Sequence, residues 1–308
     1  MSSINWKYFV VAAEELNFTR AAQKLFISQQ SLSNYIVKLE AALGLELFNR
    51  RNGLSLTEAG ESLYKNAKKI LVMEELAQKE ISDIRDFRTS SLRIGVSRSR
   101  GSRILPMVLP ELKNMYPELR VEVVEKRLKE LHRDLLEGEI DVVFAYAEEK
   151  HPDLVYEVYA KEELKLVISD TLLKSCFEPE VYEALLNMEH VPLEMFARCP
   201  FIMLKEGGWL NKKIQGYFDQ KGVTLENVFY TSCIDTMVNL GLVGYGVTVC
   251  PHIYLKEPFV NKIAKEPLHF FDLDEPGFSP DRAVIYMKKR YLPKVARDFI
   301  EIVKKYQC

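Results

Sequence analysis

Residues 18–38, with the sequence FTRAAQKLFISQQSLSNYIVK, have the pattern of two short helices joined by a tight turn. Thr19 suits an N-cap, and strong helix formers follow it up to Leu25. Ser28 is a second N-cap, and Gly44 suits the end of the second helix. Apolar residues of this second helix recur every three or four positions, which predicts one buried face. They are Leu32, Ile36, Leu39 and Leu43.

The opposite face of the second helix is polar. It carries Gln29, Gln30, Ser33, Asn34 and, further along, Lys38. Glutamine and asparagine side chains can bond adenine edges in the major groove, serine can bond several bases, and lysine suits a phosphate. The same face would also suit a solvated helix in an ordinary helical bundle, so this stretch alone leaves both interpretations open.

A hairpin is predicted shortly after the helix pair. Asn52-Gly53 stands between short apolar segments, which is a strong hairpin signal. Arg50 and Arg51 precede the turn and would make a small basic wing that suits the phosphate backbone. Two exposed arginines in a loop usually carry no function, but their position directly after a helix pair favours contact with DNA.

A long helix is predicted to open at Thr57, a good N-cap, with Glu58 at the positive end of the helix dipole. Apolar residues seven apart form a heptad seam typical of a coiled coil between two chains, although Glu74 weakens it. The predicted dimerisation residues are Leu63, Ile70, Ala77, Ile81 and Ile84. The alternative is a helix packed on its own domain. We prefer dimerisation because so long a helix covers no obvious local core.

From Leu92 the pattern changes to short strands that alternate with helices, which predicts a parallel sheet in an α/β domain. The first unit has strands at 92–97, 119–125 and 140–147 and helices at 103–116 and 128–136. The second has strands at 201–204, 228–231 and 247–250 and helices at 209–220 and 234–242. Connecting and closing segments are 155–159, 164–168, 283–287 and 292–306. Two such lobes leave a cleft, and ligands bind there at strand ends and helix N-termini.

Composition excludes several classes of protein. The chain has 308 residues, 47% of them hydrophobic and 28% charged, as in a soluble globular protein of two or three domains. A net charge near −2 means that any contact with DNA must come from local basic residues. Neither a signal peptide nor a membrane span is expected. The scattered cysteines are predicted to be free thiols in a reducing cytoplasm, with Cys199 and Cys233 buried. They are Cys176, Cys199, Cys233, Cys250 and Cys308.

Two motifs frame the N-terminal region: FTRAA at 18–22 and LTEAG at 56–60. With these motifs the chain resembles the family of LysR-type transcriptional regulators. Further matches in this region are Leu25, Ser28-Gln29, Ser33, Ile36, Leu39-Glu40, Leu43-Gly44, Leu47-Phe48 and Arg50. Looser matches to the family's effector domain are Arg93-Ile94-Gly95, Leu105-Pro106, Tyr116-Pro117, Gly138, Ile140-Asp141, Gly244 and Gly246.

The resemblance implies an architecture. A winged helix-turn-helix DNA-binding domain would occupy 1–58 and a linker and dimerisation helix 59–88. A two-lobed α/β effector-binding domain, resembling periplasmic binding proteins, would occupy 92–308. Lobe I would comprise about 92–161 and 269–308, and lobe II about 162–268. Segment 171–198, with an extra helix predicted at 178–188, is longer than usual between the lobes, and no function is assigned to it.

The resemblance also implies partners and contacts. The protein would be a homodimer, and often a dimer of dimers, on double-stranded promoter or operator DNA. Bases would be contacted by Gln29, Gln30, Ser33 and Asn34, and phosphates by Thr19, Arg20, Ala21, Lys38, Arg50 and Arg51. Gln30 stands where the family usually has proline, and Asn34-Tyr35 where Arg-Gln is commoner. The bases read at the centre of the operator are therefore expected to differ from those of typical members.

For the effector, the family uses the loop after the first strand, here 97–102. Hydroxyls, two arginines and a helix N-terminus there suit an anion such as a carboxylate. The alternative is that the arginines face solvent and only Ser99 reaches the cleft. The predicted effector-binding residues are Ser97, Arg98, Ser99, Arg100, Leu128, Tyr146, Lys205, Gly207, Ser232, Cys233 and Val247. Leu128 stands where several members have serine or threonine, which favours a partly apolar ligand or a different pose.

The sequence therefore predicts a DNA-binding transcriptional regulator controlled by a small-molecule co-inducer or co-repressor, without a cofactor or metal. One alternative is a two-lobed solute-binding protein without catalytic activity, against which the winged helix and the expected absence of a signal peptide speak. An enzyme is the third hypothesis. No nucleophile–base arrangement, set of metal ligands or phosphate loop is visible in the sequence, so we expect no turnover.

Overall fold

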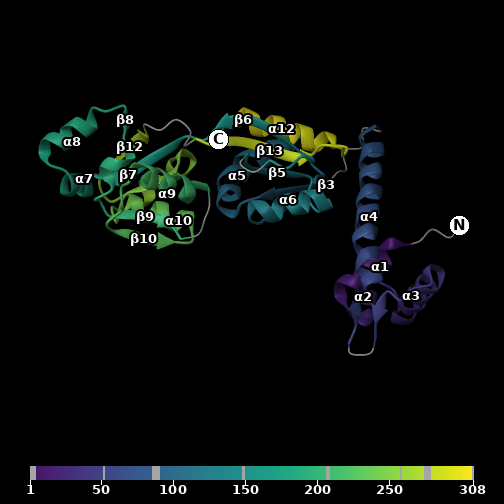
Figure 1. Cartoon of the computed structure of the whole chain (residues 1–308). Helices are drawn as coiled ribbons and strands as arrows, with labels where there is room; N and C mark the ends of the chain where they lie inside the picture. The colour runs from purple at the N-terminus through teal and green to yellow at the C-terminus, as the bar shows by residue number, and fades with distance from the viewer. Residues whose placement is uncertain are drawn as a thin grey trace.

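The computed structural model describes residues 5–50, 53–84, 91–147, 150–205, 209–256, 259–273 and 279–306. A small helical domain, one long helix and two α/β lobes follow one another along the chain (Figure 1). The predictions for Arg51, Asn52, Gly207 and Cys308, and for the side chain of Ile84, lie outside the described residues. Among the helices described, none is long and apolar enough to cross a membrane.

Three helices and a two-stranded wing form the N-terminal domain. They are α1 (Trp6–Glu15), α2 (Phe18–Lys24), α3 (Gln29–Leu43), β1 (Phe48–Asn49) and β2 (Ser55–Leu56). The two strands pair antiparallel, which confirms the predicted hairpin. Phe48 is the centre of the core, with the rings of Phe9 and Phe18 edge to face against it at 5.8 and 5.3 Å. Of the predicted apolar face of α3, Leu43 is exposed and the other three residues are buried.

The caps of these helices follow from local sequence. The Ser28 hydroxyl accepts the N–H of Ser31 at 3.1 Å, and Gly44 ends α3 in the left-handed region with φ +67°, as predicted. The prediction for α2 is wrong by two residues, because Asn17 is the N-cap in place of Thr19. The Asn17 carboxamide oxygen accepts two N–H groups at the start of the helix, which a threonine two positions later has no means to do.

Helix α4 (Glu58–Ile84) packs on two different parts of the chain and leaves one apolar stripe exposed. Its first half packs on the N-terminal domain, where Ala67 is buried and Leu63 half-buried. Its second half contacts lobe I. The exposed apolar residues form a stripe of Ile70, Met73, Ala77 and Ile81. Of the predicted dimerisation residues, Leu63 packs on the N-terminal domain, and Met73, which the predicted seam does not include, lies on the exposed stripe.

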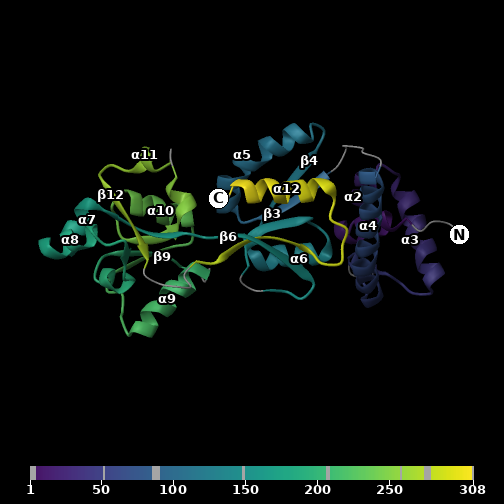
Figure 2. The same cartoon turned by 90° about the horizontal axis from the view of Figure 1, so that it is seen from above.

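Lobe I is a five-stranded mixed sheet between helices. Its elements are β3 (Ser91–Val96), α5 (Arg98–Met115), β4 (Arg120–Glu125), α6 (Leu128–Glu137), β5 (Val142–Tyr146), β6 (Leu154–Lys161), β13 (Asp281–Met287) and α12 (Lys294–Tyr306). The strand order is β4-β3-β5-β13-β6. β3 is parallel to β4 and β5, but β13 is antiparallel to β5 and β6, so the predicted parallel sheet is in fact mixed. Helices α5 and α12 cover one face and α6 the other (Figure 2).

Lobe II has a four-stranded sheet in the order β11-β7-β12-β8 and a parallel pair β10-β9. Its strands are β7 (Leu164–Ser169), β8 (His190–Val191), β9 (Phe201–Leu204), β10 (Val228–Thr231), β11 (Thr248–Pro251) and β12 (Leu268–Leu273). Its helices are α7 (Asp170–Cys176), α8 (Pro179–Leu186), η1 (Leu193–Phe196), α9 (Trp209–Lys221), α10 (Ile234–Leu242), η2 (His252–Leu255) and α11 (Phe259–Ile263). The extra segment therefore contains the predicted helix, as α8, and adds β8 to the edge of this sheet.

The boundary between the lobes differs from the prediction at one point. β12 pairs with β7 and β8 in the sheet of lobe II, so the chain returns to lobe I after Leu273 and not at residue 269. The other crossing lies between β6 and β7, at Glu162 and Glu163. Both lobes share one continuous hydrophobic cluster, which runs from α5 and α12 into the core of lobe II.

Candidate DNA-binding surface and effector cleft

The outer face of α3 carries the residues predicted to contact bases. Gln29, Gln30 and Asn34 are exposed, Lys38 lies a turn further on and is also exposed, and Ser33 is half-buried at the edge of the face. The opposite face is held in the core against α1 and α2. This helix therefore presents amide groups outward on a firmly packed support, which is an arrangement that can address base edges in a major groove.

Tyr35, one of the two departures from the family pattern, does not share this outer face. Its ring packs edge to face on Tyr8 at 5.4 Å, and burial raises the pKa of its hydroxyl. Of the pair Asn34-Tyr35, only the asparagine side chain is exposed. Any change in base preference that the pair causes must therefore act through Asn34.

The N-terminus of α2 corrects one predicted phosphate contact. Ala21 is fully buried, and its N–H donates to the carbonyl of Asn17 at 2.9 Å. The N–H groups of Thr19 and Arg20 both donate to the Asn17 side chain at 3.0 Å. These backbone groups are therefore used inside the domain, and only the side chains of Thr19 and Arg20 face solvent. Glu15 holds Arg20 in place by accepting Nη2 on its carbonyl at 2.9 Å.

The wing arginine has a defined position. Nη2 of Arg50 donates to the carboxylate of Glu40 at 2.7 Å, and its guanidinium lies 6.0 Å from the ring of Phe18. Glu40 also accepts the N–H groups of Leu47 and Phe48 at 2.8 and 3.2 Å. One carboxylate on α3 thus ties the wing to the helix, a role that the sequence did not reveal because the partners are seven to ten residues apart.

The predicted effector loop is the first turn of a helix, since α5 begins at Arg98 and not at residue 103. Ser97 is its N-cap residue and is exposed, without a capping bond from its side chain. Arg98 is 87% exposed and lies 3.6 Å from the carboxylate of Glu125 on β4. The predicted alternative therefore holds for Arg98, which faces solvent.

Arg100 points inward to the junction of the lobes. Nη2 donates to Glu162 at 2.7 Å, and both side chains are almost completely buried. The guanidinium also lies 4.1 Å from the ring centre of Tyr146, whose hydroxyl donates to the same Glu162 carboxylate at 2.9 Å. Burial raises the pKa of Tyr146 well above its ordinary value, so the hydroxyl stays a donor. The positive charge predicted to attract an anion is therefore already neutralised from within the chain.

Two further contacts bridge the cleft. Arg103 on α5 donates to Asp235 on α10 at 2.8 Å, and its guanidinium lies 5.0 Å from the ring of Tyr254 in η2. Burial raises the pKa of the Tyr254 hydroxyl to about 12, and the Ser99 side chain is near enough to counteract part of that shift. Arg103 could not be predicted as a cleft residue from the sequence, because its partner Asp235 lies 132 residues away.

The far wall of the cleft is only partly as predicted. Ser232 and Cys233 are exposed at the start of α10, and Lys205 is exposed at the end of β9. The predicted burial of Cys233 is wrong, since the residue is exposed. Backbone N–H groups of α10, first that of Thr236, lower the pKa of its thiol.

Two of the predicted cleft residues belong to the packing of the lobes. Val247 is fully buried, with its N–H bonded to Pro200, and so presents no side-chain surface to the cleft. Leu128 packs on the core beneath α6. Val247 therefore has no side-chain surface for a ligand, while Leu128, which is half-buried, leaves the predicted partly apolar ligand or different pose as a prediction.

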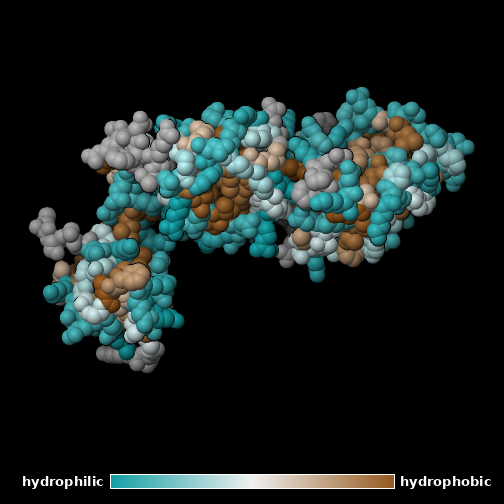
Figure 3. Space-filling model, turned by 180° about the vertical axis from the view of Figure 1, so that it is seen from behind, coloured by the Kyte–Doolittle hydropathy of each residue, from teal (hydrophilic) through white to brown (hydrophobic). Residues whose placement is uncertain are grey.

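Two other features of the surface bear on chemistry. A groove of about 930 Å³ runs between α5 and β4, with an apolar floor that includes Leu105, Leu109, Val121 and Val123. It is part of the apolar patch visible on lobe I in Figure 3, and none of the cleft residues Arg100, Tyr146 or Cys233 lines it.

Within the described ranges, no group of three or more histidine, cysteine or acidic side chains could hold a metal ion.

Two family models match the chain. The model for the LysR substrate binding domain matches residues 85–307, and that for the bacterial regulatory helix-turn-helix protein, lysR family, matches residues 5–61. An uncharacterised HTH-type transcriptional regulator of Bacillus subtilis is 27% identical over 304 residues, covering 96% of this chain and 92% of that protein. The DNA-binding transcriptional dual regulator OxyR of Escherichia coli is 28% identical over 246 residues, covering 80% of this chain and 77% of that protein.

Solved structures share the fold over the whole chain. A full-length OxyR from Pseudomonas aeruginosa superposes with a TM-score of 0.67 at 21% identity, covering 99% of this chain and 94% of that one. Full-length CbnR in complex with its target DNA superposes with a TM-score of 0.60 at 20% identity, covering 97% and 98%. At these identities the likeness extends to the arrangement of all three parts of the chain, and to nothing finer.

Proposed function

The chain belongs to the LysR-type family of DNA-binding transcriptional regulators, which is not a family of enzymes, and we infer from its site geometry that α3 reads an operator while a small effector binds between the lobes. The observation that carries this inference is the outer face of α3, where Gln29, Gln30 and Asn34 are exposed opposite a buried apolar face. A two-lobed solute-binding protein would not need a helix with such an exposed face of amide side chains.

A gel-shift experiment tests the reading of DNA. The intact protein should retard a fragment of its own upstream region, and Asn34→Ala should weaken specific binding by about 1–3 kcal/mol, the worth of one good base contact. Gln78→Ala, on an exposed position of α4, is the control and should bind normally. Unchanged selectivity of Asn34→Ala would remove that base contact, and failure of the protein to retard any such fragment would overturn the proposed function.

The arginines of the cleft face carboxylates of the same chain, which argues against the simple anionic effector that the sequence predicts. Arg100 is paired with Glu162 and Arg103 with Asp235, so the charges of these two described arginines are already compensated within the chain. We propose a small polar effector that bonds Ser99 and the start of α10. An anionic effector would need the exposed Lys205 or would have to displace Glu162 from Arg100.

A thermal-shift screen of small acids, amino acids and neutral polar compounds tests this site. The compound that stabilises the wild type should lose most of its effect with Ser99→Ala. Ser102→Ala is the matched control, because Ser102 is exposed on the same turn and its hydroxyl donates only to the carbonyl of Ser99. Stabilisation that survives Ser99→Ala would place the effector elsewhere.

The exposed stripe on α4 supports a proposal about self-association. Ile70, Met73, Ala77 and Ile81 lie on one side of the helix, turned away from both the N-terminal domain and lobe I. Four apolar positions at heptad-like spacing suit a second copy of the same helix. We therefore propose a homodimer through α4, which would bring two copies of α3 to one operator; assembly into a dimer of dimers remains part of the same proposal.

A further inference from the structure

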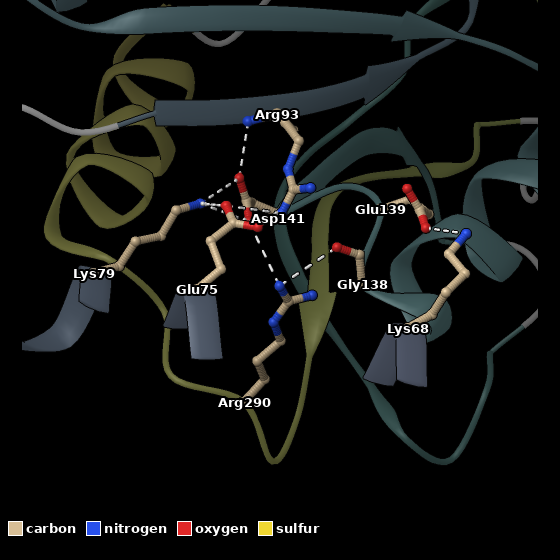
Figure 4. Close-up of polar contacts among 8 residues, drawn as sticks. All are labelled: Lys68, Glu75, Lys79, Arg93, Gly138, Glu139, Asp141 and Arg290. Atoms are coloured by element: carbon tan, nitrogen blue, oxygen red, sulfur yellow. Dashed lines mark hydrogen bonds and ion pairs between the residues drawn. The ribbon is translucent and has the colours of Figure 1, made fainter. Parts of the chain in front are cut away.

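Helix α4 docks on lobe I of its own chain through a buried cluster of charged side chains (Figure 4). The Lys79 side chain is 8% exposed, and its Nζ lies 3.3 and 3.2 Å from the two carboxylate oxygens of Asp141. The Asp141 carboxylate also accepts the backbone N–H of Arg93 at 2.9 Å. Glu75, one turn before Lys79 on α4, accepts from Lys79 at 3.1 Å and from Arg93 Nη2 at 3.2 Å. Two residues of the helix and two of the lobe therefore interlock.

The end of α6 in lobe I lets α4 approach closely, because a glycine stands at the point of contact. Gly138 ends α6 with φ +80°, and a Cβ added there would lie 2.5 Å from a methyl group of Val72 on α4. Arg290, from the segment after β13, donates to the Gly138 carbonyl at 3.5 Å and lies 3.8 Å from Asp141. Lys68, nearer the start of the helix, forms an ion pair with Glu139. Helix and lobe thus meet along three turns of α4.

The charges in this cluster do not balance. Three cations, Lys79, Arg93 and Arg290, face two carboxylates, Glu75 and Asp141. Burial lowers the pKa of Arg290, and two buried guanidinium atoms, Nε of Arg93 and Nη1 of Arg290, have no hydrogen-bond partner among the described residues. A buried ion pair adds little net stability because desolvation offsets the attraction, whereas removing one partner of such a pair is strongly destabilising. The contact therefore fixes the orientation of α4 on lobe I without adding a large net free energy of docking.

The strands of lobe I connect this cluster with the effector cleft. Arg93 lies in β3, and the end of β3 leads directly to Ser97 and the buried Arg100 at the start of α5. Asp141 directly precedes β5, whose last residue is Tyr146. The amino ends of both strands thus hold α4, and their carboxyl ends line the cleft. A small shift of these two strands would move both sites together.

We propose that Lys79 and Glu75 form a latch that docks the linker helix on lobe I, and that the state of the inter-lobe cleft sets how often the latch is closed. The proposal rests on the proposed function, since it explains how an effector would reorient the DNA-binding domain that is packed on the other half of α4. Lys79 is a positioning residue: it lies outside both the outer face of α3 and the inter-lobe cleft, in contact with Glu75 and Asp141. Docked and open forms would differ in the angle between that domain and the lobes.

A zero-length carbodiimide cross-link measures docking on the full chain without DNA. It joins Lys68 to Glu139 only when α4 lies on lobe I, and its yield is read by mass spectrometry relative to the Lys305–Glu111 link inside lobe I. Lys79→Met should lower the relative yield several-fold, because it keeps the aliphatic stem and removes the charge, while Asp141 keeps the Arg93 N–H. Lys69→Met, an exposed lysine of the same helix, should leave the yield unchanged.

Two further variants complete the experiment. Glu75→Gln should lower the yield in the same direction, and it serves as the second variant if Lys79→Met reduces folding, which circular dichroism reports for every variant. Arg103→Met removes the ion pair across the cleft and should change the Lys68–Glu139 yield, with the change lost in the double variant with Lys79→Met. An unchanged yield in Lys79→Met and Glu75→Gln would overturn the latch. An unchanged yield in Arg103→Met would overturn its coupling to the cleft. Because no DNA is present, failure of the proposed function in the gel shift is a separate result.

Discussion

The guanidinium of Arg100 on lobe I donates to the carboxylate of Glu162, 2.7 Å away, at the point where the chain crosses into lobe II. Both side chains are buried, and Tyr146 completes the cluster from the end of β5. Removing one member of a buried pair leaves the other charge without compensation, which costs more than the pair itself contributes.

Glu162→Gln should therefore destabilise the effector domain by roughly 3 kcal/mol. Urea unfolding followed by tryptophan fluorescence measures the loss. The adjacent residue gives the control: the Glu163 side chain is 69% exposed and its carboxylate lies 3.3 Å from Nδ1 of His252, so Glu163→Gln should change stability by less than about 0.5 kcal/mol. Equal free energies of unfolding for the two variants would mean that the Arg100–Glu162 pair does not stabilise the effector domain.

Gly60, in the first turn of α4, is predicted to tolerate no side chain. A Cβ at this position would lie 2.1 Å from the backbone carbonyl oxygen of Leu47, a residue just before β1 whose backbone is held by hydrogen bonds with Glu40 and Thr57. Gly60→Ala should therefore destabilise the DNA-binding domain by about 2 kcal/mol or more and reduce operator binding accordingly.

Gly216 provides the opposite case within the same chain. It lies inside α9, and a Cβ there would meet no atom within 4 Å. Gly216→Ala should stabilise the protein by up to about 1 kcal/mol, because alanine restricts the unfolded chain and suits a helix. Calorimetry on Gly60→Ala and Gly216→Ala measures the change in melting temperature of each variant. A stabilising Gly60→Ala would contradict the packing of α4 against the wing.

The proposed dimer through α4 makes a further prediction. Met73 is 65% exposed at the centre of the apolar stripe, so Met73→Glu places a charge where two helices would meet and should shift the protein toward monomer. Gln78→Glu introduces the same charge about 140° further around the helix and should leave the association state unchanged. Sedimentation velocity at matched concentrations compares the two. Dimers of equal stability in both variants would move the interface elsewhere.

Local signals predicted much of this fold, and long-range pairings could not be predicted. Ser28 and Gly44 act on backbone groups within a few residues, so their roles follow from the sequence, and the wing follows from its turn. Asn17 was missed because Thr19 is an equally good cap by residue type alone. In the cleft, Glu162 and Asp235 become partners of Arg100 and Arg103 only through the packing of two lobes. Val247 was misplaced because a strand end can face a cleft or the core, and only the sheet order decides.

The cysteines are predicted to react in a fixed order. Cys233 is exposed and the N–H groups of α10 lower the pKa of its thiol, whereas burial raises the pKa of both Cys199 and Cys250. Since the thiolate is the nucleophile, iodoacetamide at neutral pH should modify Cys233 first among these three. Peptide mapping at increasing times gives the order. Cys199 and Cys250 should react only after unfolding in guanidinium, and early labelling of Cys250 would contradict its placement in the core.

Asp170 should give the stability of lobe II a dependence on acid pH. Hydrogen bonds from Lys174, His269 and Tyr182, at 2.7, 2.9 and 2.8 Å, hold the pKa of its carboxyl well below the usual range. A folded-state pKa below that of the unfolded chain, about 3.9, stabilises the fold above that value, and the contribution is lost as the pH falls through it. The same pairing raises the pKa of Lys174, and that contribution is lost only as the pH rises toward the alkaline range.

Asp170→Asn should therefore be less stable than the wild type between about pH 5 and 9, with the two curves converging as the pH falls below about 4. Urea unfolding at a series of pH values measures the difference. Tyr182→Phe removes one of the three donors and should show a smaller difference over the same acid range, because Lys174 and His269 still bond the carboxylate. A constant difference between wild type and Asp170→Asn down to pH ~3, below the unfolded value, would show that Asp170 acts through packing and not through its charge.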